Sequence, residues 1–140
     1  MNYLSTFIRI APDSPTRSAL VPPSRSERKA IHIIQYELIF AKPYEYTQED
    51  VLWAVYLVHK SIPAPKATAA ARAKFFAKGQ PCLRTSALCK RYGWGFHFDD
   101  RGRVALVAAG TPQYDRLVKT KELQQLNGMR STRAKSQGGA

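Results

Sequence analysis

The chain has 140 residues, 44% of them hydrophobic and 11% aromatic, which is enough for one domain with its own core. Its net charge of +12 favours nucleic acid or phosphorylated small molecules as partners, although a basic protein without any anionic partner would have the same composition. No apolar run approaches the ~18 residues of a membrane span, no signal peptide is expected, and the two cysteines argue against a disulfide framework, so we expect a cytoplasmic protein.

The first segments of the chain predict a strand, a loop and a helix. Residues 3–11 are a short β-prone run that predicts an N-terminal strand. Residues 12–26 carry prolines among serines and arginines and predict a long irregular connection. Ser24 and Glu27 have the spacing of a capping box, which predicts a helix to about Phe40. The β-branched residues early in that run leave a strand as the alternative.

More helical segments are expected before Gly93. Thr47 and Asp50 are placed to cap a second helix, which carries a broad apolar stripe. Residues 68–78 are rich in alanine and predict a third helix. A short helical turn is expected to start at Thr85 or Ser86. The core side of the third helix is expected to carry small or aromatic residues: Ala69, Ala73 and Phe76.

Residues 94–108 have the clearest pattern in the chain, that of a β-hairpin. Aromatic residues alternate with small or polar ones over 94–98, apolar residues alternate again after 104, and Asp99–Gly102 has the chemistry of a type I turn. This closure places Phe98 opposite Val104. One face is then apolar and assigned to the core: Trp94, Phe96, Phe98, Val104 and Leu106. The other face, which we expect to be the polar one, carries Gly95, His97, Arg103, Ala105 and Val107.

The pattern as a whole predicts a single α+β domain over residues 1–128. After the hairpin, Thr111 and Pro112 predict the start of a helix that runs to about Leu126. The small antiparallel sheet is expected to consist of the N-terminal strand and the hairpin, with four or five helices on one face. Residues 129–140 are basic, lack apolar periodicity and are expected to form a mobile tail.

The sequence contains no strong catalytic or metal-binding motif. There is no GxSxG, P-loop, HExxH or GxGxxG pattern, so whether the protein is an enzyme stays open. Cys82 and Cys89 lack a nearby pair of histidines and would make a poor zinc site, and neither a metal nor a cofactor is expected. The second and third helices could imitate a helix-turn-helix, but the proline-rich break between them is longer than that motif uses.

The candidate ligand site lies on the polar side of the hairpin and its approach. An arginine such as Arg91 can bind phosphate or carboxylate through two parallel hydrogen bonds, and Tyr92 offers a ring for stacking. His97 would stay neutral among guanidinium groups and could donate a hydrogen bond to an anion. Solvated arginines and a histidine without a role are the alternative. The predicted site consists of Arg84, Lys90, Arg91, Tyr92, His97 and Arg103.

Glu37 is a secondary candidate. It lies in the apolar helix before Phe40, so we expect a charged partner, most simply an arginine in a buried ion pair. A general base is the functional alternative. Tyr44 and Tyr46 form an aromatic turn that either packs on the core or offers a stacking surface for a base.

Several short strings resemble a family of small bacterial proteins that is known only as a domain of unknown function. The resemblance covers nearly the whole chain and implies a single-domain bacterial cytoplasmic protein, but no activity. The matching strings include MNY at the start, Thr6-Phe7-Ile8, Val21-Pro22-Pro23, Gln35-Tyr36-Glu37-Leu38 and Lys90-Arg91-Tyr92-Gly93-Trp94-Gly95.

The sequence favours a binding module for an anionic ligand, with nucleic acid as the leading form. The basis is the stretch between Asp50 and Asp99, which contains no carboxylate but many lysines and arginines. One alternative is an enzyme or sensor that acts on a phosphorylated or carboxylated small molecule. Another is a structural or protein-interaction domain. The sequence predicts no membrane partner and leaves the oligomeric state open.

Overall fold

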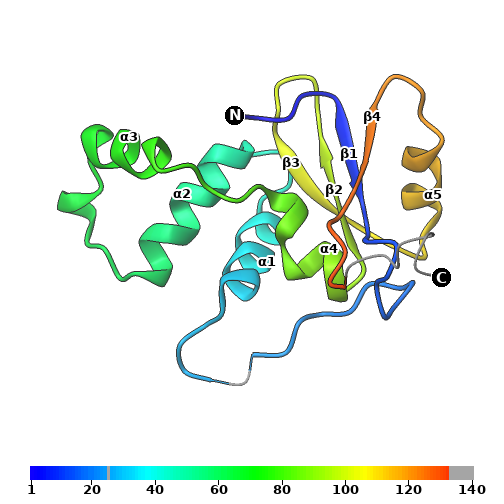
Figure 1. Cartoon of the computed structure of the whole chain (residues 1–140), viewed down its shortest axis with the longest axis horizontal. Coiled ribbons are helices and arrows are strands. Elements are labelled where there is room, and N and C mark those ends of the chain that lie inside the picture. The colour runs from blue at the N-terminus through cyan, green and yellow to red at the C-terminus, as the bar shows by residue number, and fades with distance from the viewer. Residues whose placement is uncertain (25, 133–140) are drawn as a thin grey trace, which may run out of the picture.

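A four-stranded sheet with the order β3-β2-β1-β4 organises the molecule. The computed structural model describes residues 1–24 and 26–132. Figure 1 shows α1, α2 and α4 on one side of the sheet and α5 on the other. In chain order the elements are β1 (Thr6–Arg9), α1 (Ile31–Ala41), α2 (Gln48–His59), the 3-10 helix η1 (Ala64–Lys66), α3 (Ala69–Ala77), the 3-10 helix η2 (Leu83–Thr85), α4 (Ala87–Arg91), β2 (Trp94–Phe98), β3 (Val104–Ala108), α5 (Pro112–Val118) and β4 (Gln124–Asn127).

The hairpin has the predicted register, and the α+β fold class is confirmed. Phe98 lies opposite Val104, and β1 pairs antiparallel with β2. The Asp99 carboxylate closes the turn by accepting hydrogen bonds from the Arg101 and Arg103 amides, both at 2.9 Å. Gly102 follows with a φ of 79°, a left-handed conformation that glycine adopts without a steric penalty.

The fourth strand was not predicted. The helix expected to reach Leu126 ends at Val118, and β4 then pairs parallel with β1, which makes the sheet mixed. Backbone hydrogen bonds place this strand: the Gln124 amide donates to the Ser5 carbonyl, and the Gly128 amide donates to the Arg9 carbonyl, both at 2.8 Å. Because the side chains of β4 lack an apolar alternation, the sequence gives no strand signal there.

Both faces of the sheet are covered, so the prediction that all helices lie on one face was wrong. The aromatic face of β2 packs on α1, α2 and α4, as expected. The other face of the hairpin is not a polar surface, because α5 covers much of it. Phe7 and Val107 are buried there, and the ring of Phe7 lies 5.1 Å from that of Tyr114. Gly95 is buried against Phe7, where a larger side chain would collide with the ring.

The first two helices begin differently from one another. The α1 segment is a helix and not a strand, but the predicted capping box of Ser24 and Glu27 is wrong, since the helix starts after Ala30 without any side-chain cap. In α2 the capping box is confirmed. The Asp50 amide donates to the Thr47 hydroxyl at 3.2 Å, and the Thr47 amide donates to the Asp50 carboxylate at 3.1 Å.

Helix α3 is confirmed, and the Thr68 hydroxyl caps it, which was not predicted; the helix projects away from the sheet (Figure 1). It has no buried residue, and the expected core-facing Ala69 and Ala73 are exposed. Its Phe75 ring lies 4.5 Å from that of Tyr56 on α2. These contacts attach α3 to α2 and not to the main core.

The described C-terminal residues lie against the domain. The Met129 amide donates to the Arg84 carbonyl at 2.8 Å, and the Ser131 and Thr132 amides donate to the Asp13 carboxylate at 3.0 Å. The tail was predicted to be mobile over residues 129–140; residues 129–132 are held by these hydrogen bonds, and residues 133–140 lie outside the described residues. Within the described residues, no helix has the length and apolar character needed to cross a membrane.

Candidate functional site

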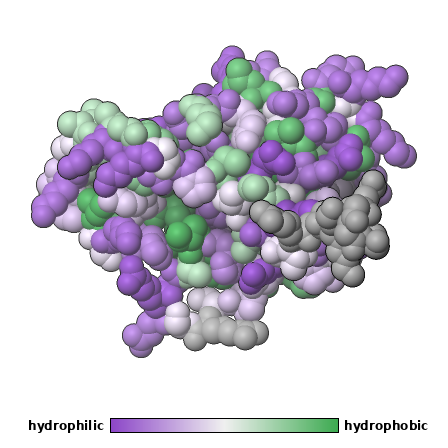
Figure 2. All heavy atoms as spheres, viewed as in Figure 1, coloured by the Kyte–Doolittle hydropathy of each residue, from purple (hydrophilic) through white to green (hydrophobic). Residues whose placement is uncertain are grey.

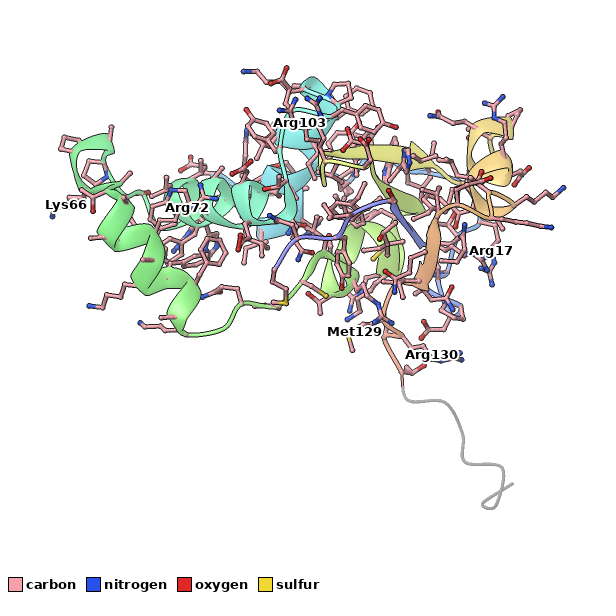
Figure 3. All side chains as sticks on the ribbon, turned by 90° about the horizontal axis from the view of Figure 1, so that it is seen from above. Arg17, Lys66, Arg72, Arg103, Met129 and Arg130 are labelled. Atoms are coloured by element: carbon pink, nitrogen blue, oxygen red, sulfur yellow. The ribbon has the colours of Figure 1, made fainter. Side chains whose placement is uncertain are left out.

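The structure does not bring the six predicted ligand-binding residues together. Figure 3 shows Arg103 far from Met129 and Arg130, across the sheet. Arg84 neighbours Met129 and Arg130, since its carbonyl accepts the Met129 amide and all three line one cavity. The six residues fall into three places: Lys90, Arg91 and Tyr92 at the end of α4, His97 and Arg103 on the hairpin, and Arg84 beside β4.

His97 is half-buried and hydrogen-bonded to a tyrosine. The Tyr44 hydroxyl lies 2.7 Å from His97 Nδ1. Burial lowers the pKa of His97, while the Asp99 carboxylate opposes the shift. The imidazole is therefore neutral at pH 7 because it is desolvated, and the predicted effect of neighbouring guanidinium groups is not the cause. The aromatic turn uses Tyr44 to pack against the hairpin.

Glu37 is not in a buried ion pair. Its carboxylate accepts hydrogen bonds from Lys29 Nζ at 2.8 and 3.0 Å, and about half of each side chain is exposed. The expected buried pair with an arginine is therefore wrong. Exposed pairs of this kind stabilise little, and nothing in this geometry marks Glu37 as a general base.

The structure contains a cavity of about 450 Å³ between α1, α2, α3 and residues 80–87, which we call the helical cleft. Figure 2 shows apolar atoms set back between hydrophilic ones over the junction of α1 and α2. The apolar wall of the cleft consists of Leu52, Val55, Tyr56, Phe75 and Pro81. Its polar lining includes His32, Gln35, His59, Lys60, Cys82 and Ser86.

The floor of the cleft holds a buried side-chain amide. Gln35 is only 5% exposed, and its Oε1 accepts a hydrogen bond of 2.6 Å from the Ser86 hydroxyl. Ser86 caps α4 at the same time, because its Oγ accepts the Leu88 amide at 3.1 Å. The Gln35 Nε2 group has no acceptor within the described part of the chain, and Gln35 lines the cavity. No buried side-chain nitrogen or oxygen of the described residues lacks a partner, so Nε2 is an accessible donor that the cleft offers on an otherwise buried residue.

The rim of the cleft is cationic at the amino end of α1. His59 and Lys60 also line an adjoining cavity of about 630 Å³, together with Arg28 and the acidic Glu27. The Arg28 guanidinium donates to the His59 carbonyl at 3.1 Å, which joins the segment before α1 to the end of α2. Because α1 has neither a side-chain cap nor an acidic residue in its first turn, its amino end keeps its positive potential.

His32 connects the cleft to two of the predicted residues. Its ring stacks on Tyr92 with centroids 5.2 Å apart and an interplanar angle of 15°. Burial, followed by the charge of Arg91, lowers the pKa of His32, so the ring is neutral at pH 7. The neutral histidine beside an arginine that the sequence led us to expect at His97 is thus found at His32.

The cysteines differ in environment. Both are free thiols: Cys82 is partly exposed and lines the cleft, whereas Cys89 is buried and its pKa is raised to about 12 by burial. Tyr3 lies beside Cys82, and burial together with a hydrogen bond to Cys82 raises the pKa of Tyr3 to about 12. Among the residues that the structure describes, no group of three or more His, Cys, Asp or Glu side chains could hold a metal ion.

Sequence reasoning missed the cleft because its parts are far apart in the chain. Gln35 enters the sequence analysis only in the string Gln35-Tyr36-Glu37-Leu38, and nothing local pairs it with Ser86, 51 positions away. The available signal was the combination of a buried-looking glutamine and two histidines on neighbouring helices. Taken alone, each of these residues is typical of a packing or surface position.

The fold and the cleft together define a small α+β protein whose candidate site is an apolar cavity with a cationic rim. The family of unknown function DUF6157 matches residues 1–134, so the chain belongs to that family, as the resemblance of its short strings predicted. No curated protein and no solved structure matches the chain.

Proposed function

We propose that this protein is a binding module for a small organic anion, which it takes up in the helical cleft. The observation that carries the proposal is Gln35 at the floor of the cleft, a residue only 5% exposed whose Nε2 group has no acceptor in the described chain. No side-chain nitrogen or oxygen of the described residues is both fully buried and without a partner, so the Gln35 Nε2 group is accessible and can donate a hydrogen bond to an oxygen atom of a ligand.

The ligand we propose has an acidic group and an apolar body. The acidic group would lie at the rim, near Lys60, His59 and the uncapped amino end of α1, where backbone amides favour anions. The apolar body would pack on Tyr56 and Phe75. The volume of about 450 Å³ falls within the range of small-molecule sites.

The proposal is tested by titrating aryl carboxylates and aryl phosphates into the protein in a calorimeter, after a thermal-shift screen. We expect Gln35→Met and Lys60→Gln each to weaken binding by ~tenfold, which corresponds to ~1.4 kcal/mol. Lys66→Gln is the matched control, because Lys66 carries the same charge on an exposed turn that does not line the cleft. Equal losses in all three variants, or no ligand at all, would refute the site.

Cys82 gives a second readout in the unmodified protein. Its thiol lines the cleft, whereas the buried Cys89 should react only after unfolding. A ligand in the cleft should slow the modification of Cys82 by a thiol reagent in proportion to occupancy. If a ligand binds tightly and leaves that rate unchanged, it binds elsewhere.

Nucleic acid is the second candidate, supported by the net charge of +12 and the carboxylate-free segment after Asp50. The two candidates differ in salt dependence: many phosphate contacts make affinity fall steeply with salt, whereas one small anion gives a shallow slope.

An enzyme or sensor for phosphorylated or carboxylated small molecules would use the same cleft, and turnover of a bound ligand would identify it. Two free thiols support a reducing, cytoplasmic location.

A further inference from the structure

The two edges of the sheet differ in how their backbone groups are satisfied. The β3 edge is covered by the turn between α1 and α2: the Tyr44 amide donates to the Val104 carbonyl at 2.9 Å, and the Val104 amide donates to the Tyr46 carbonyl at 2.8 Å. A bridge between Thr47 and Arg103 extends this cover. The Val104 end of the β3 edge is therefore closed to a further strand.

The β4 edge is open. Backbone amides alternate between the two sides of a strand, and those of Gln124 and Gly128 bond β1, so those of Gln125 and Asn127 point outward. Neither outward amide, nor the Gln125 carbonyl, has a partner within residues 1–24 and 26–132. The Asn127 carbonyl accepts a hydrogen bond from Arg84 Nε at 2.8 Å. Unpaired strand edges of this kind are templates for an added strand.

Basic side chains flank the open edge at both ends. Arg84 and Arg130 lie at the carboxyl end of β4, beside Asn127, in the lining of a cavity of about 600 Å³. The exposed Lys119 and Lys121 precede the strand. The acidic residues of this region are Asp13, which is bonded to the Ser131 and Thr132 amides, together with Asp115 and Glu122.

We propose that the β4 edge binds an extended acidic segment of a partner protein, which adds to the sheet as a further strand. The peptide backbone would bond the free groups of Gln125 and Asn127, and its carboxylates would meet the flanking cations. Met129 is 48% exposed in the same cavity as Arg130 and offers an apolar contact for a side chain of the segment (Figure 3). This surface is independent of the helical cleft.

The charge and the backbone geometry favour this partner over two others. A second copy of the chain would bring the same cations of Arg84, Arg130 and Lys121 against each other, and each copy has a net charge of +12. A single-stranded nucleic acid would use the cations but not the alternating amides and carbonyls. It would also lack a stacking platform at Tyr114 of α5, which is buried.

The test measures fluorescence polarisation of a labelled short peptide that alternates Glu and Val, with the full-length protein. We expect binding that is lost when alternate peptide amides are N-methylated, because those amides bond the strand edge. The same peptide with Lys in place of Glu should not bind. Failure of the acidic peptide to bind, or equal binding of the N-methylated peptide, would overturn the proposal.

Protein variants separate strand addition from general attraction of anions. Asn127→Pro removes an outward amide at an edge position that tolerates proline, and should weaken the peptide by ~tenfold or more. Lys121→Glu with Arg130→Glu should weaken it at least as much. The control with equal charge change is Lys66→Glu with Lys74→Glu, two exposed lysines in residues 64–79, the segment that we call the α3 arm. The proposal fails if a single-stranded oligonucleotide of equal charge binds more tightly than the peptide and its affinity is unchanged by Asn127→Pro. That result would assign the surface to nucleic acid.

Discussion

The sheet and the α3 arm use similar side chains in different ways. Phe96 and Phe98 of β2 are fully buried between the sheet and its helices. Phe75 of α3 packs on Phe76 and on two aromatic rings of α2, yet α3 has no buried residue. Aromatic residues therefore form a core only where a second layer covers them. The α3 arm forms a wall of the helical cleft, so the less firmly held region is the one that borders the candidate site.

The largest difference is expected from removing one phenyl ring in each region. Phe96→Ala should lower the free energy of unfolding by ~3–5 kcal/mol, because a fully buried ring leaves a cavity. Phe76→Ala, at a partly exposed site, should cost only ~1 kcal/mol. Urea denaturation followed by circular dichroism gives both values. Equal costs would show that α3 belongs to the same cooperative core as the sheet.

Two glycines, one just before β2 and one just after α3, extend the comparison between the sheet and the α3 arm. Gly93 has a φ of 75°, and a Cβ atom there would collide with the Ser18 carbonyl, so Gly93→Ala should cost ~3 kcal/mol. Gly79 ends the arm with a φ of 70° and open space around it, so Gly79→Ala should cost only the ~1 kcal/mol of the left-handed backbone. Melting temperatures of the two variants should differ accordingly. A smaller loss for Gly93→Ala would mean that the connection around Ser18 can move aside.

The dependence of stability on pH tests the half-buried histidines. The pKa values of His32 and His97 lie below their ordinary value of 6.5, so the folded state binds fewer protons than the unfolded chain. Stability is therefore full above pH 6.5 and falls as pH drops below it. His97→Asn keeps an acceptor for the Tyr44 hydroxyl and should reduce this fall by less than ~1 kcal/mol, because the ring is partly solvated. The free energy of unfolding is measured by denaturation at pH 7.5 and pH 5. If it falls by the same amount in His97→Asn as in the unmodified protein, this account is contradicted.

The smallest effect is expected at the ion pair that joins the arm to α2. Arg72 Nη2 lies 2.9 Å from Asp50 Oδ1, and each side chain is 37% exposed. Arg72→Gln should therefore cost only ~0.5 kcal/mol of global stability. Amide hydrogen exchange should nevertheless speed up in α3 and not in β2. Lys74→Gln, on the exposed side of the same helix, should leave both rates as they are.

Local patterns predicted the elements whose conformation depends on neighbouring residues. The alternation of residues 94–98 and the turn at Asp99–Gly102 gave the hairpin register, because a period of two and a fixed turn length leave one pairing. Thr47 and Asp50 gave the start of α2, because a capping box acts within one helical turn. The site predicted from the same local patterns does not form one cluster, because charge and sequence proximity do not say which helix faces which.

The sequence by itself determined the α+β class, the hairpin, the cap of α2 and the presence of helix α3, since these follow from interactions over a few residues. Tertiary structure alone decided that residues 124–127 form a strand, because the bonds that hold β4 come from β1, more than a hundred positions away. It also decided that Gln35 meets Ser86 beneath a cavity. Such contacts depend on how helices pack against a sheet, and packing brings together distant residues whose pairing no local sequence pattern indicates.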